Sequence, residues 1–259
     1  NLDARLEIGD AAAELTTLAA SFNELLTRID ESFEGVRRFV ADASHELRTP
    51  IAVIRGEADV ALANDRSAAE YREALAIILD ESRRLSVLVD DLLNLARADA
   101  GSVKLRTQPF YWNDLLGECC RSMQSLAAAR RIHLAYRAAP DVPDVPFDGD
   151  EELLRRMTLN LLDNAIRYTP SGGRVSAELE ARADGVLLRI SDTGVGIPPE
   201  AAPHVFERFF RADKARSREN GGFGLGLAIV KWIAESHRGV VELASQPGAG
   251  SVFTVTLPR

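Results

Sequence analysis

A histidine and an acidic residue stand side by side in a stretch of the sequence with helical periodicity. The stretch reads VADASHELRTPIAVI over residues 40–54, and it places His45 next to Glu46. A neutral imidazole can act as a nucleophile, and an adjacent carboxylate can remove or orient its proton. Exposed histidines are common on helices, so this pair by itself indicates only a candidate site.

The neighbours of His45 predict that its side chain faces solvent. Ala43 and Leu47 belong to the apolar seam of the helix, and His45 lies between them on the other side of the helical wheel. Pro50 has no N–H and leaves the carbonyl of Glu46 without its helical partner. We therefore expect the helix to loosen or bend beside the histidine.

A second group of polar residues lies on the helix predicted for EELLRRMTLNLLDNAIRYTP. Asn160 and Asn164 are one turn apart on one face of this helix, and Arg167 and Tyr168 follow them. Carboxamide oxygens suit a hard cation such as Mg²⁺, which keeps several waters and bridges phosphates. Asparagines at this spacing are often only solvated, so the pattern favours a phosphate-associated metal site without establishing it.

Two glycine-rich segments indicate nucleotide chemistry. DTGVGIP ends a predicted strand with Asp192, where a flat ring could approach the backbone and the carboxylate could accept a hydrogen bond from an exocyclic amine. GGFGLGLAIVK opens a helix whose first N–H groups can hold phosphates. No strand directly precedes it and no βαβ unit surrounds it, so it is not a dinucleotide-binding fingerprint. The intervening residues 201–222 contain phenylalanines and arginines and are typical of a lid.

The first hundred residues predict two long helices and no sheet. From residue 14 to about residue 63, apolar positions recur at steps of three and four, which is the pattern of a coiled-coil seam. The turn NDRSAAE offers Asp65 or Ser67 as the N-cap of a second helix with the same pattern. A hairpin with so narrow a seam cannot bury its apolar face alone, so we expect a homodimer that forms a four-helix bundle.

The second half predicts an α/β unit after a linker at residues 96–109. A helix is expected at residues 112–129, a strand near residues 131–137 and a short strand within residues 141–150. Asp148 or Asp150 can start the asparagine-bearing helix. The runs GRVSAELEAR and GVLLRISD predict one hairpin, and GVVELASQ and SVFTVTLP predict another. Helices on one face of a mixed sheet are the arrangement that this order implies.

Composition sets outer bounds on the class of protein. The chain has 259 residues and a formal net charge of −8, with no block of Lys and Arg, so nothing favours nucleic-acid binding. Cys119 and Cys120 are adjacent, which disfavours a disulfide between them and fits a reducing compartment. No apolar run is long enough to span a bilayer. Because the chain begins with Asn1 inside a helical pattern, we expect a piece of a longer protein whose missing part could hold a membrane anchor.

Six segments, taken together and in order, resemble the sensor histidine kinases of two-component signalling. The resemblance covers the chain from about Phe33 to Leu257. SHELRTP matches the phosphoacceptor box, NLLDNAIRYT the asparagine box and FERFFRAD the phenylalanine box. DTGVGIP and GGFGLGLAIVK match the two glycine boxes, and GAGSVFTVTLP matches the closing strands. The leading segment AELTTLAASFNELLTRI resembles the last helix of a HAMP linker. The implied domains are a HAMP-like helix at residues 1–30, a dimerisation and histidine-phosphotransfer hairpin at residues 31–100, and a catalytic ATP-binding domain of the GHKL class at residues 101–259.

The resemblance implies a role for each matching residue of the hairpin. His45 would accept the γ-phosphoryl group of ATP, and Glu46 would act as the base. Arg48 belongs to the same catalytic box, and Thr49 would position a water that hydrolyses the phosphorylated partner. The implied partners are a second copy of the chain and the receiver domain of a response regulator, with no nucleic acid.

The resemblance also implies an ATP site with Mg²⁺ in the second half. Asn164 would bind the metal ion and Asp192 would read the adenine amine. Arg167 stands where many members have lysine, and Phe223 enlarges a position that is often small. The remaining residues implied for ATP binding are Asn160, Tyr168, Gly194, Gly196, Ile197, Gly222, Gly224, Leu225, Gly226, Leu227 and Thr254.

Three alternatives stay open at this point. A related GHKL-type ATPase would share the nucleotide fold but lack the histidine hairpin that this chain has. A signalling scaffold with a degenerate ATP domain would lack box residues, all of which are present. A phosphatase-biased sensor without significant autokinase activity would use the same hairpin, so the sequence does not separate it from a kinase. The resemblance further implies that this chain is the cytoplasmic portion of a membrane-anchored sensor.

Overall fold

The computed structural model describes residues 13–101, 103–137, 144–212 and 222–259. The chain divides into two compact units, residues 1–87 and residues 88–259. The predicted lid falls partly on residues 213–221, and the predicted HAMP-like segment falls partly on residues 1–12, both of which lie outside the described residues.

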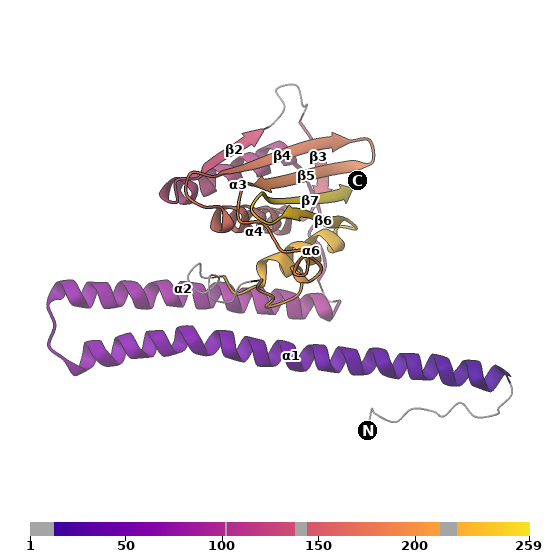
Figure 1. The fold of residues 1–259 in the computed structure, drawn as a ribbon, viewed down its shortest axis with the longest axis horizontal. Coiled ribbons are helices and arrows are strands. Elements are labelled where there is room, and N and C mark those ends of the chain that lie inside the picture. Colours follow the sequence, from indigo (N-terminus) through magenta and orange to yellow (C-terminus); the bar gives the residue numbers. More distant parts are fainter. Residues whose placement is uncertain (1–12, 102, 138–143, 213–221) are drawn as a thin grey trace. The chain divides into compact units, whose positions relative to one another are not determined.

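The first unit is a helical hairpin, as the sequence predicts. Helix α1 spans Ala13–Ala63, and helix α2 spans Ala68–Asp99 and continues into the second unit (Figure 1). Ser67 starts α2 in a reciprocal capping arrangement, because its N–H donates to Glu70 Oε2 at 2.8 Å while its Oγ lies 3.4 Å from the Glu70 N–H. Ser67 is therefore the cap, and Asp65 is not.

Helix α1 continues through Pro50. The helix is assigned without a break from residue 13 to residue 63, with Pro50 inside it. Pro50 is buried, whereas the adjacent Thr49 is exposed. The proline removes one backbone donor but does not end the helix.

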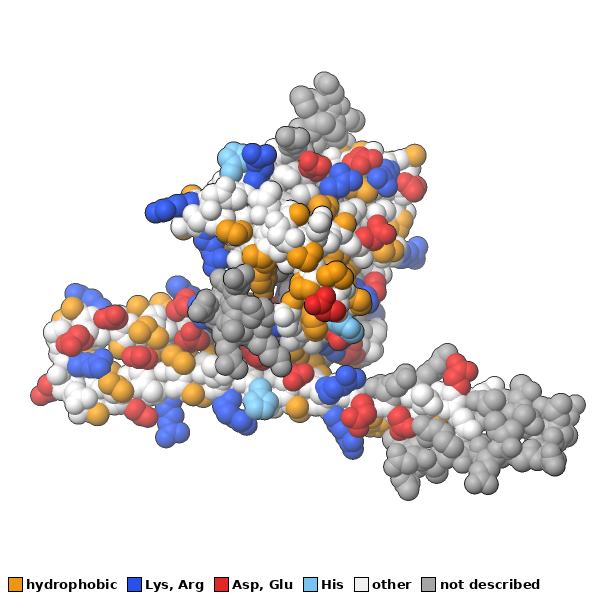
Figure 2. Space-filling model, in the orientation of Figure 1, with side chains coloured by type: hydrophobic (Ala, Val, Ile, Leu, Met, Phe, Trp, Pro, Cys, Tyr) orange, Lys and Arg blue, Asp and Glu red, His pale blue; other side chains and the backbone are white. Residues whose placement is uncertain are grey.

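Large apolar side chains remain exposed along the hairpin of a single chain. On α1, Phe33, Val36 and Val40 each expose more than half of their surface, and Leu75 does so on α2. Figure 2 shows hydrophobic side chains interspersed with charged ones along this part of the molecule. Apolar residues that repeat at seam spacing and stay exposed favour contact with another protein surface.

The second unit contains a five-stranded mixed sheet. Its strand order is β2-β4-β5-β7-β6, with β2 parallel to β4 and all other neighbours antiparallel. The strands are β2 (His133–Arg137), β4 (Arg174–Arg182), β5 (Gly185–Asp192), β6 (Val240–Gln246) and β7 (Gly250–Pro258). Both predicted hairpins, β4–β5 and β6–β7, are present.

Helices supply the other layer of this unit in the part that the structure describes. They are α3 (Trp112–Ala129), α4 (Glu151–Tyr168) and α6 (Gly226–Ser236), and a short 3-10 turn, η1, spans Ala202–His204. Figure 1 shows the helices gathered on one side of the sheet, and residues alternate between buried and less buried along β4 and β7. The fold is thus a helical hairpin followed by a mixed α/β layer structure, as expected.

A second, two-stranded sheet corrects one sequence-based expectation. Strand β1 (Gln108–Tyr111) pairs antiparallel with β3 (Pro146–Gly149). The start of β1 lies within residues 96–109, which we expected to form a linker. Phe110, Trp112 and Phe147 pack around this pair, with ring centroids 5.6–6.0 Å apart. Trp112 is fully buried, and this aromatic packing gives a four-residue ribbon its stability.

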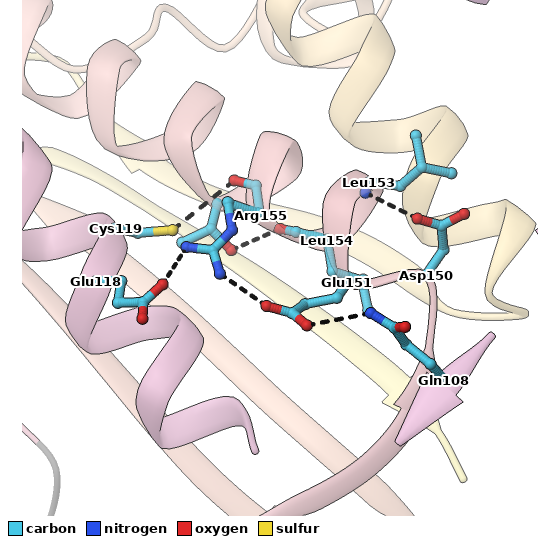
Figure 3. A network of polar contacts seen from close by, with 9 residues as sticks. Gln108, Glu118, Cys119, Asp150, Glu151, Leu153, Leu154 and Arg155 are labelled. Atoms are coloured by element: carbon cyan, nitrogen blue, oxygen red, sulfur yellow. Dashed lines mark hydrogen bonds and ion pairs between the residues drawn. The ribbon is translucent and has the colours of Figure 1, made fainter. Parts of the chain in front are cut away.

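Polar contacts connect the start of α4 to α3 and β1. Arg155 pairs with Glu118 of α3 at 2.6 Å and with Glu151 of α4 at 2.7 Å, while Gln108 of β1 donates to Glu151 at 3.3 Å (Figure 3). These groups are partly exposed, so each pair stabilises the unit only modestly. Asp150 is the N-cap of α4, because its Oδ1 accepts from the Leu153 N–H at 3.2 Å.

Candidate functional site

His45 lies on the exposed surface of α1. Its side chain faces solvent, while Ala43 and Leu47 on the seam are half-buried. Arg48 and Thr49 are also exposed, and Glu46 is half-buried. The predicted outward orientation of the histidine is therefore observed, and an incoming reactant can reach its ring nitrogens.

Asp192 ends strand β5 in a buried position, and the hydrogen bonds to its carboxylate from the described residues all go to one oxygen. Its Oδ1 accepts hydrogen bonds from the Gly194 N–H at 2.8 Å and from the Ser251 N–H at 3.2 Å. Burial raises the pKa of this carboxyl, while the two backbone hydrogen bonds act in the opposite direction. Among the described residues no hydrogen bond involves Oδ2, which is thus able to accept from an amine.

Ser251 and Ser245 are hydrogen-bonded to the Asp192 turn, and no motif in the sequence singles them out. Ser251 is buried and supplies one backbone donor to Asp192. Ser245 Oγ accepts from the Ile197 N–H at 2.8 Å, donates to the Gly250 carbonyl at 2.9 Å and lies 3.0 Å from Ser251 Oγ. The alternation of β7 next to Gly250 could have placed Ser251 on the same face as Asp192.

The close approach of neighbouring backbone requires glycine at positions 194 and 196. A Cβ on Gly194 would lie 2.5 Å from the Tyr168 carbonyl oxygen, and one on Gly196 would lie 2.1 Å from the Gln246 carbonyl oxygen. Gly196 also has a φ of 69°. The close neighbour of each glycine is therefore protein backbone, and the ring contact that the sequence suggested is at most an additional reason for these glycines.

Gly196→Ala is expected to destabilise the protein more than Gly248→Ala. Both positions have positive φ, but a Cβ on Gly248 meets nothing within 4 Å, whereas one on Gly196 overlaps the Gln246 carbonyl. The backbone strain is shared, so the overlap should cost about 1–3 kcal/mol more. Chemical denaturation of the two variants measures this difference, and equal losses would contradict the assigned packing of the turn.

The end of α4 lies against the Asp192 turn. The Tyr168 carbonyl accepts from the Val195 N–H at 3.2 Å, which joins the helix to the DTGVGIP segment. Arg167 is half-buried and pairs with Asp163 at 2.5 Å. Asn164 is half-buried, and its carboxamide lies one turn before Tyr168. The structure thus brings the predicted metal, phosphate and base-binding groups to one end of the unit.

The N-terminus of α6 lies beside Asn160. Asn160 Nδ2 is 3.5 Å from the Gly226 carbonyl, and Leu225 is buried at the N-cap position. Gly224 has a φ of 74° and accepts from the Phe209 N–H at 2.9 Å. Gly222 and Leu227 are half-buried in the same segment. Free N–H groups at such a helix start can bind phosphate oxygens.

Thr254 does not belong with the other predicted site residues. It pairs with Arg189 of β5 and Glu242 of β6, whereas Asp192 pairs with Ser251. Paired residues share a face and the face alternates along a strand, so Thr254 lies on the opposite side of the sheet from Asp192. We therefore remove Thr254 from the candidate site.

The site groups suit an adenine nucleotide. Asp192 offers a buried acceptor, the start of α6 offers backbone donors, and Asn160 and Asn164 offer carboxamides on α4. A hard cation would find an oxygen ligand in Asn164 and further ligands in nucleotide phosphates. These features are typical of a nucleotide-binding module, and the same chain carries a histidine-bearing hairpin.

Comparisons with known proteins agree with this class. Residues 36–101 match the family model described as "His Kinase A (phospho-acceptor) domain", and residues 149–259 match "Histidine kinase-, DNA gyrase B-, and HSP90-like ATPase". The chain is 36% identical over 258 residues to the sensor histidine kinase CusS of Escherichia coli K12 and 37% identical over 231 residues to RppB of Synechocystis. These alignments cover 100% and 89% of this chain, and 53% and 50% of the relatives.

Solved structures give the same result. The full-length ShkA structure in complex with AMPPNP has a TM-score of 0.65 at 28% identity, covering 86% of this chain and 45% of that one. The histidine kinase AdeS of Acinetobacter baumannii has a similar fold, with a TM-score of 0.66 at 24% identity, over 83% of this chain and 97% of that one. The chain belongs to the sensor histidine kinase family.

The chain spans about half the length of the curated relatives that it matches. Within the described residues, each helix is too short or too polar to cross a membrane.

Proposed function

We propose that this chain catalyses ATP-dependent phosphorylation of His45 and passes the phosphoryl group to an aspartate of a response-regulator receiver domain. The observation that supports it most is the exposed imidazole of His45 within a phospho-acceptor domain, in the same chain as the buried acceptor Asp192. Phosphoryl transfer requires little covalent help from a protein, so positioning and charge neutralisation account for most of the catalysis.

In the proposed reaction, an imidazole nitrogen of His45 bonds to the γ-phosphorus and the bond from that phosphorus to the bridging oxygen breaks. Glu46 removes or orients the ring proton, which keeps the attacking nitrogen available. Asp192 Oδ2 accepts from the adenine amine and so orients the nucleotide. Mg²⁺ with ATP would supply charge neutralisation at the phosphates, next to Asn164, Asn160 and Arg167.

Incubation of the purified chain with Mg²⁺ and γ-labelled ATP tests this function. Protein-bound label that survives base but not acid is expected, and it should disappear when Mg²⁺ is chelated. A receiver domain with an intact aspartate should then take the label from the chain. Nucleotide binding without any protein-bound label would instead favour a plain GHKL-type ATPase or a phosphatase-biased sensor.

A phosphatase activity toward the phosphorylated receiver would use the same hairpin. Thr49 is exposed one turn after His45, so its hydroxyl can reach a water near a docked partner. A phosphorylated receiver incubated with the chain and ADP distinguishes this activity, because a phosphatase releases inorganic phosphate while a plain ATPase does not.

The exposed seam of the hairpin supports a homodimer. Val36 and Val40 lie one turn apart on α1 and are 54% and 57% exposed in a single chain, which is unusual for seam residues. A second hairpin would cover them and complete a four-helix bundle.

Charging the seam is expected to dissociate this dimer. The double variant Val36→Glu/Val40→Glu places two carboxylates in the bundle, whereas Arg38→Ala alters the exposed residue between them and serves as the control. Sedimentation at micromolar concentration should give a monomer for the first variant and a dimer for the second. A dimer for both would place the interface elsewhere.

The HAMP-like segment supports a membrane-anchored parent protein. We infer that residues 1–30 join a membrane helix of the longer protein to this chain, which would lie on the cytoplasmic side where ATP is available. Localisation of the full-length protein with a tag at its C-terminus tests the inference.

A further inference from the structure

A buried histidine at the end of α6 has no part in the nucleotide site described above. His237 is the C-cap residue of α6 and is only 8% exposed. Its Nε2 lies 3.1 Å from the Asp150 backbone nitrogen, and its Nδ1 lies 2.9 Å from the Ile233 carbonyl oxygen. Because an amide N–H only donates and a carbonyl only accepts, the ring carries its hydrogen on Nδ1.

The partner of His237 is itself a fully engaged buried residue. Asp150 is 8% exposed, and its Oδ1 accepts from the Leu153 N–H at the start of α4. Its Oδ2 accepts from the Arg106 N–H at 2.9 Å. Figure 3 shows the Asp150 carboxylate directed at Leu153. His237 and Asp150 thus form a buried hub that joins the end of α6 to the start of α4.

The opposite ends of the same two helix segments meet at the nucleotide site. There Asn160 Nδ2 lies 3.5 Å from the Gly226 carbonyl, and a Cβ on Gly226 would lie 3.8 Å from Asn160 Cγ. Asp150 and Asn160 are ten positions apart, and Gly226 and His237 are eleven. At a rise of 1.5 Å per residue, both spans are about 15–17 Å. The two helices are therefore antiparallel. They are in contact at both ends of segments that have nearly the same length.

We propose that His237 is a positioning residue for the nucleotide site, and that it sets the register of α6 along α4. The hub prevents α6 from sliding or rotating against α4. The start of α6, which faces the phosphates, therefore keeps its contact with Asn160. The proposal rests on the proposed function in one respect, namely that the ligand of this site is ATP. His237 acts at a distance of about one helix length and does not touch the ligand.

Two substitutions separate the hub contact from the general packing of the ring. In His237→Gln the longer carboxamide can still accept from the Asp150 N–H, as Nε2 does. In His237→Asn the shorter carboxamide can donate to the Ile233 carbonyl, as Nδ1 does, but it leaves the buried Asp150 N–H without a partner. Val186→Ala is the stability control, because Val186 is buried at the end of β5 opposite to Asp192.

The affinity for a non-hydrolysable ATP analogue is the first measurement, made by calorimetry well below the melting temperature of each variant. His237→Asn should bind the analogue about tenfold more weakly than wild type, and His237→Gln within about twofold of it. Val186→Ala should lose thermal stability but keep its affinity. Equal affinities for His237→Asn and Val186→Ala would overturn the proposal, and so would a large loss in His237→Gln.

Hydrogen exchange without nucleotide is the second measurement. The Ile229 N–H bonds to the Leu225 carbonyl, so it reports the first turn of α6. Its exchange should accelerate in His237→Asn and remain slow in His237→Gln and Val186→Ala. Unchanged exchange in His237→Asn would overturn the proposal. Because this readout needs no ligand, it still tests the register if wild type fails to bind ATP, which would refute the proposed function alone.

Discussion

His45→Gln is expected to abolish protein-bound phosphate while leaving ATP binding intact. Glutamine has no nitrogen that can form a phosphoramidate under these conditions, so the loss should be complete within the detection limit. The side chain is exposed on α1, and the substitution should therefore change the free energy of unfolding by no more than about 0.5 kcal/mol.

The measurement is label incorporation from γ-labelled ATP beside the affinity for an ATP analogue. Arg55→Gln provides a control on the exposed surface of α1, because Arg55 lies outside the SHELRTP segment and its substitution removes no imidazole. Label that persists in His45→Gln would assign the phosphoacceptor to another residue. Lost affinity together with lost label would instead indicate a damaged fold.

Asp192→Asn is expected to weaken ATP binding by about 100-fold or more, because a site built around a hydrogen bond rejects a partner that cannot form it. The asparagine can still accept from Gly194 and Ser251 through one oxygen. Its NH₂ group then replaces the free Oδ2 and presents a donor to the adenine amine, which is also a donor. The variant should bind a 6-oxopurine nucleotide better, relative to ATP, than wild type does.

The thermal stability of Asp192→Asn distinguishes an effect on nucleotide recognition from an effect on folding. Removal of a buried carboxylate should leave the melting temperature at neutral pH equal to or above that of wild type, because burial disfavours the charged form. An unchanged preference for ATP would contradict the assignment of Asp192 to the adenine amine. A lower melting temperature would instead attribute the weaker binding to a damaged fold.

The raised pKa of Asp192 gives this site two opposite responses to acid. The pKa in the folded state lies above the reference value of 3.8, so the folded state binds the proton more tightly than the unfolded state. The destabilisation by this carboxylate is therefore present above the folded pKa and is relieved as the pH falls through it. Nucleotide affinity should fall over the same range, because a protonated Asp192 offers a hydroxyl where the amine needs an acceptor. Affinity measured from pH 7 downward in wild type and Asp192→Asn tests the link. Both proteins should lose affinity as the nucleotide phosphates take up protons, and wild type should lose more than the variant.

The elements that the sequence predicted well are those with a local signal. Residues 112–129 and 151–168 form helices because their apolar positions repeat with a helical period and Asp150 supplies a cap. The β4–β5 hairpin forms where two alternating runs meet at Ala183 and Asp184. His45 is exposed because its seam neighbours determine the orientation of the whole turn.

The features that the sequence did not predict depend on partners far away in the chain. Strand β1 has four residues, one of them Pro109. It forms because it pairs with β3 and packs in an aromatic cluster. Thr254 and Ser251 lie in one strand, and only the pairing of β7 with β5 decides which of them faces Asp192. The buried contact of His237 with Asp150 joins residues 87 positions apart, so no local sequence pattern predicts it.

The β1–β3 ribbon determines where the chain can be truncated without damage to the second unit. A fragment that starts at residue 149, where the ATPase family match begins, would omit α3, most of β3 and the Trp112 ring that packs on Phe147. It would also lack the Arg106 N–H that the Asp150 carboxylate accepts from. The smallest fragment with an intact interior therefore begins upstream of Arg106, and shorter ones should expose apolar surface and aggregate on expression.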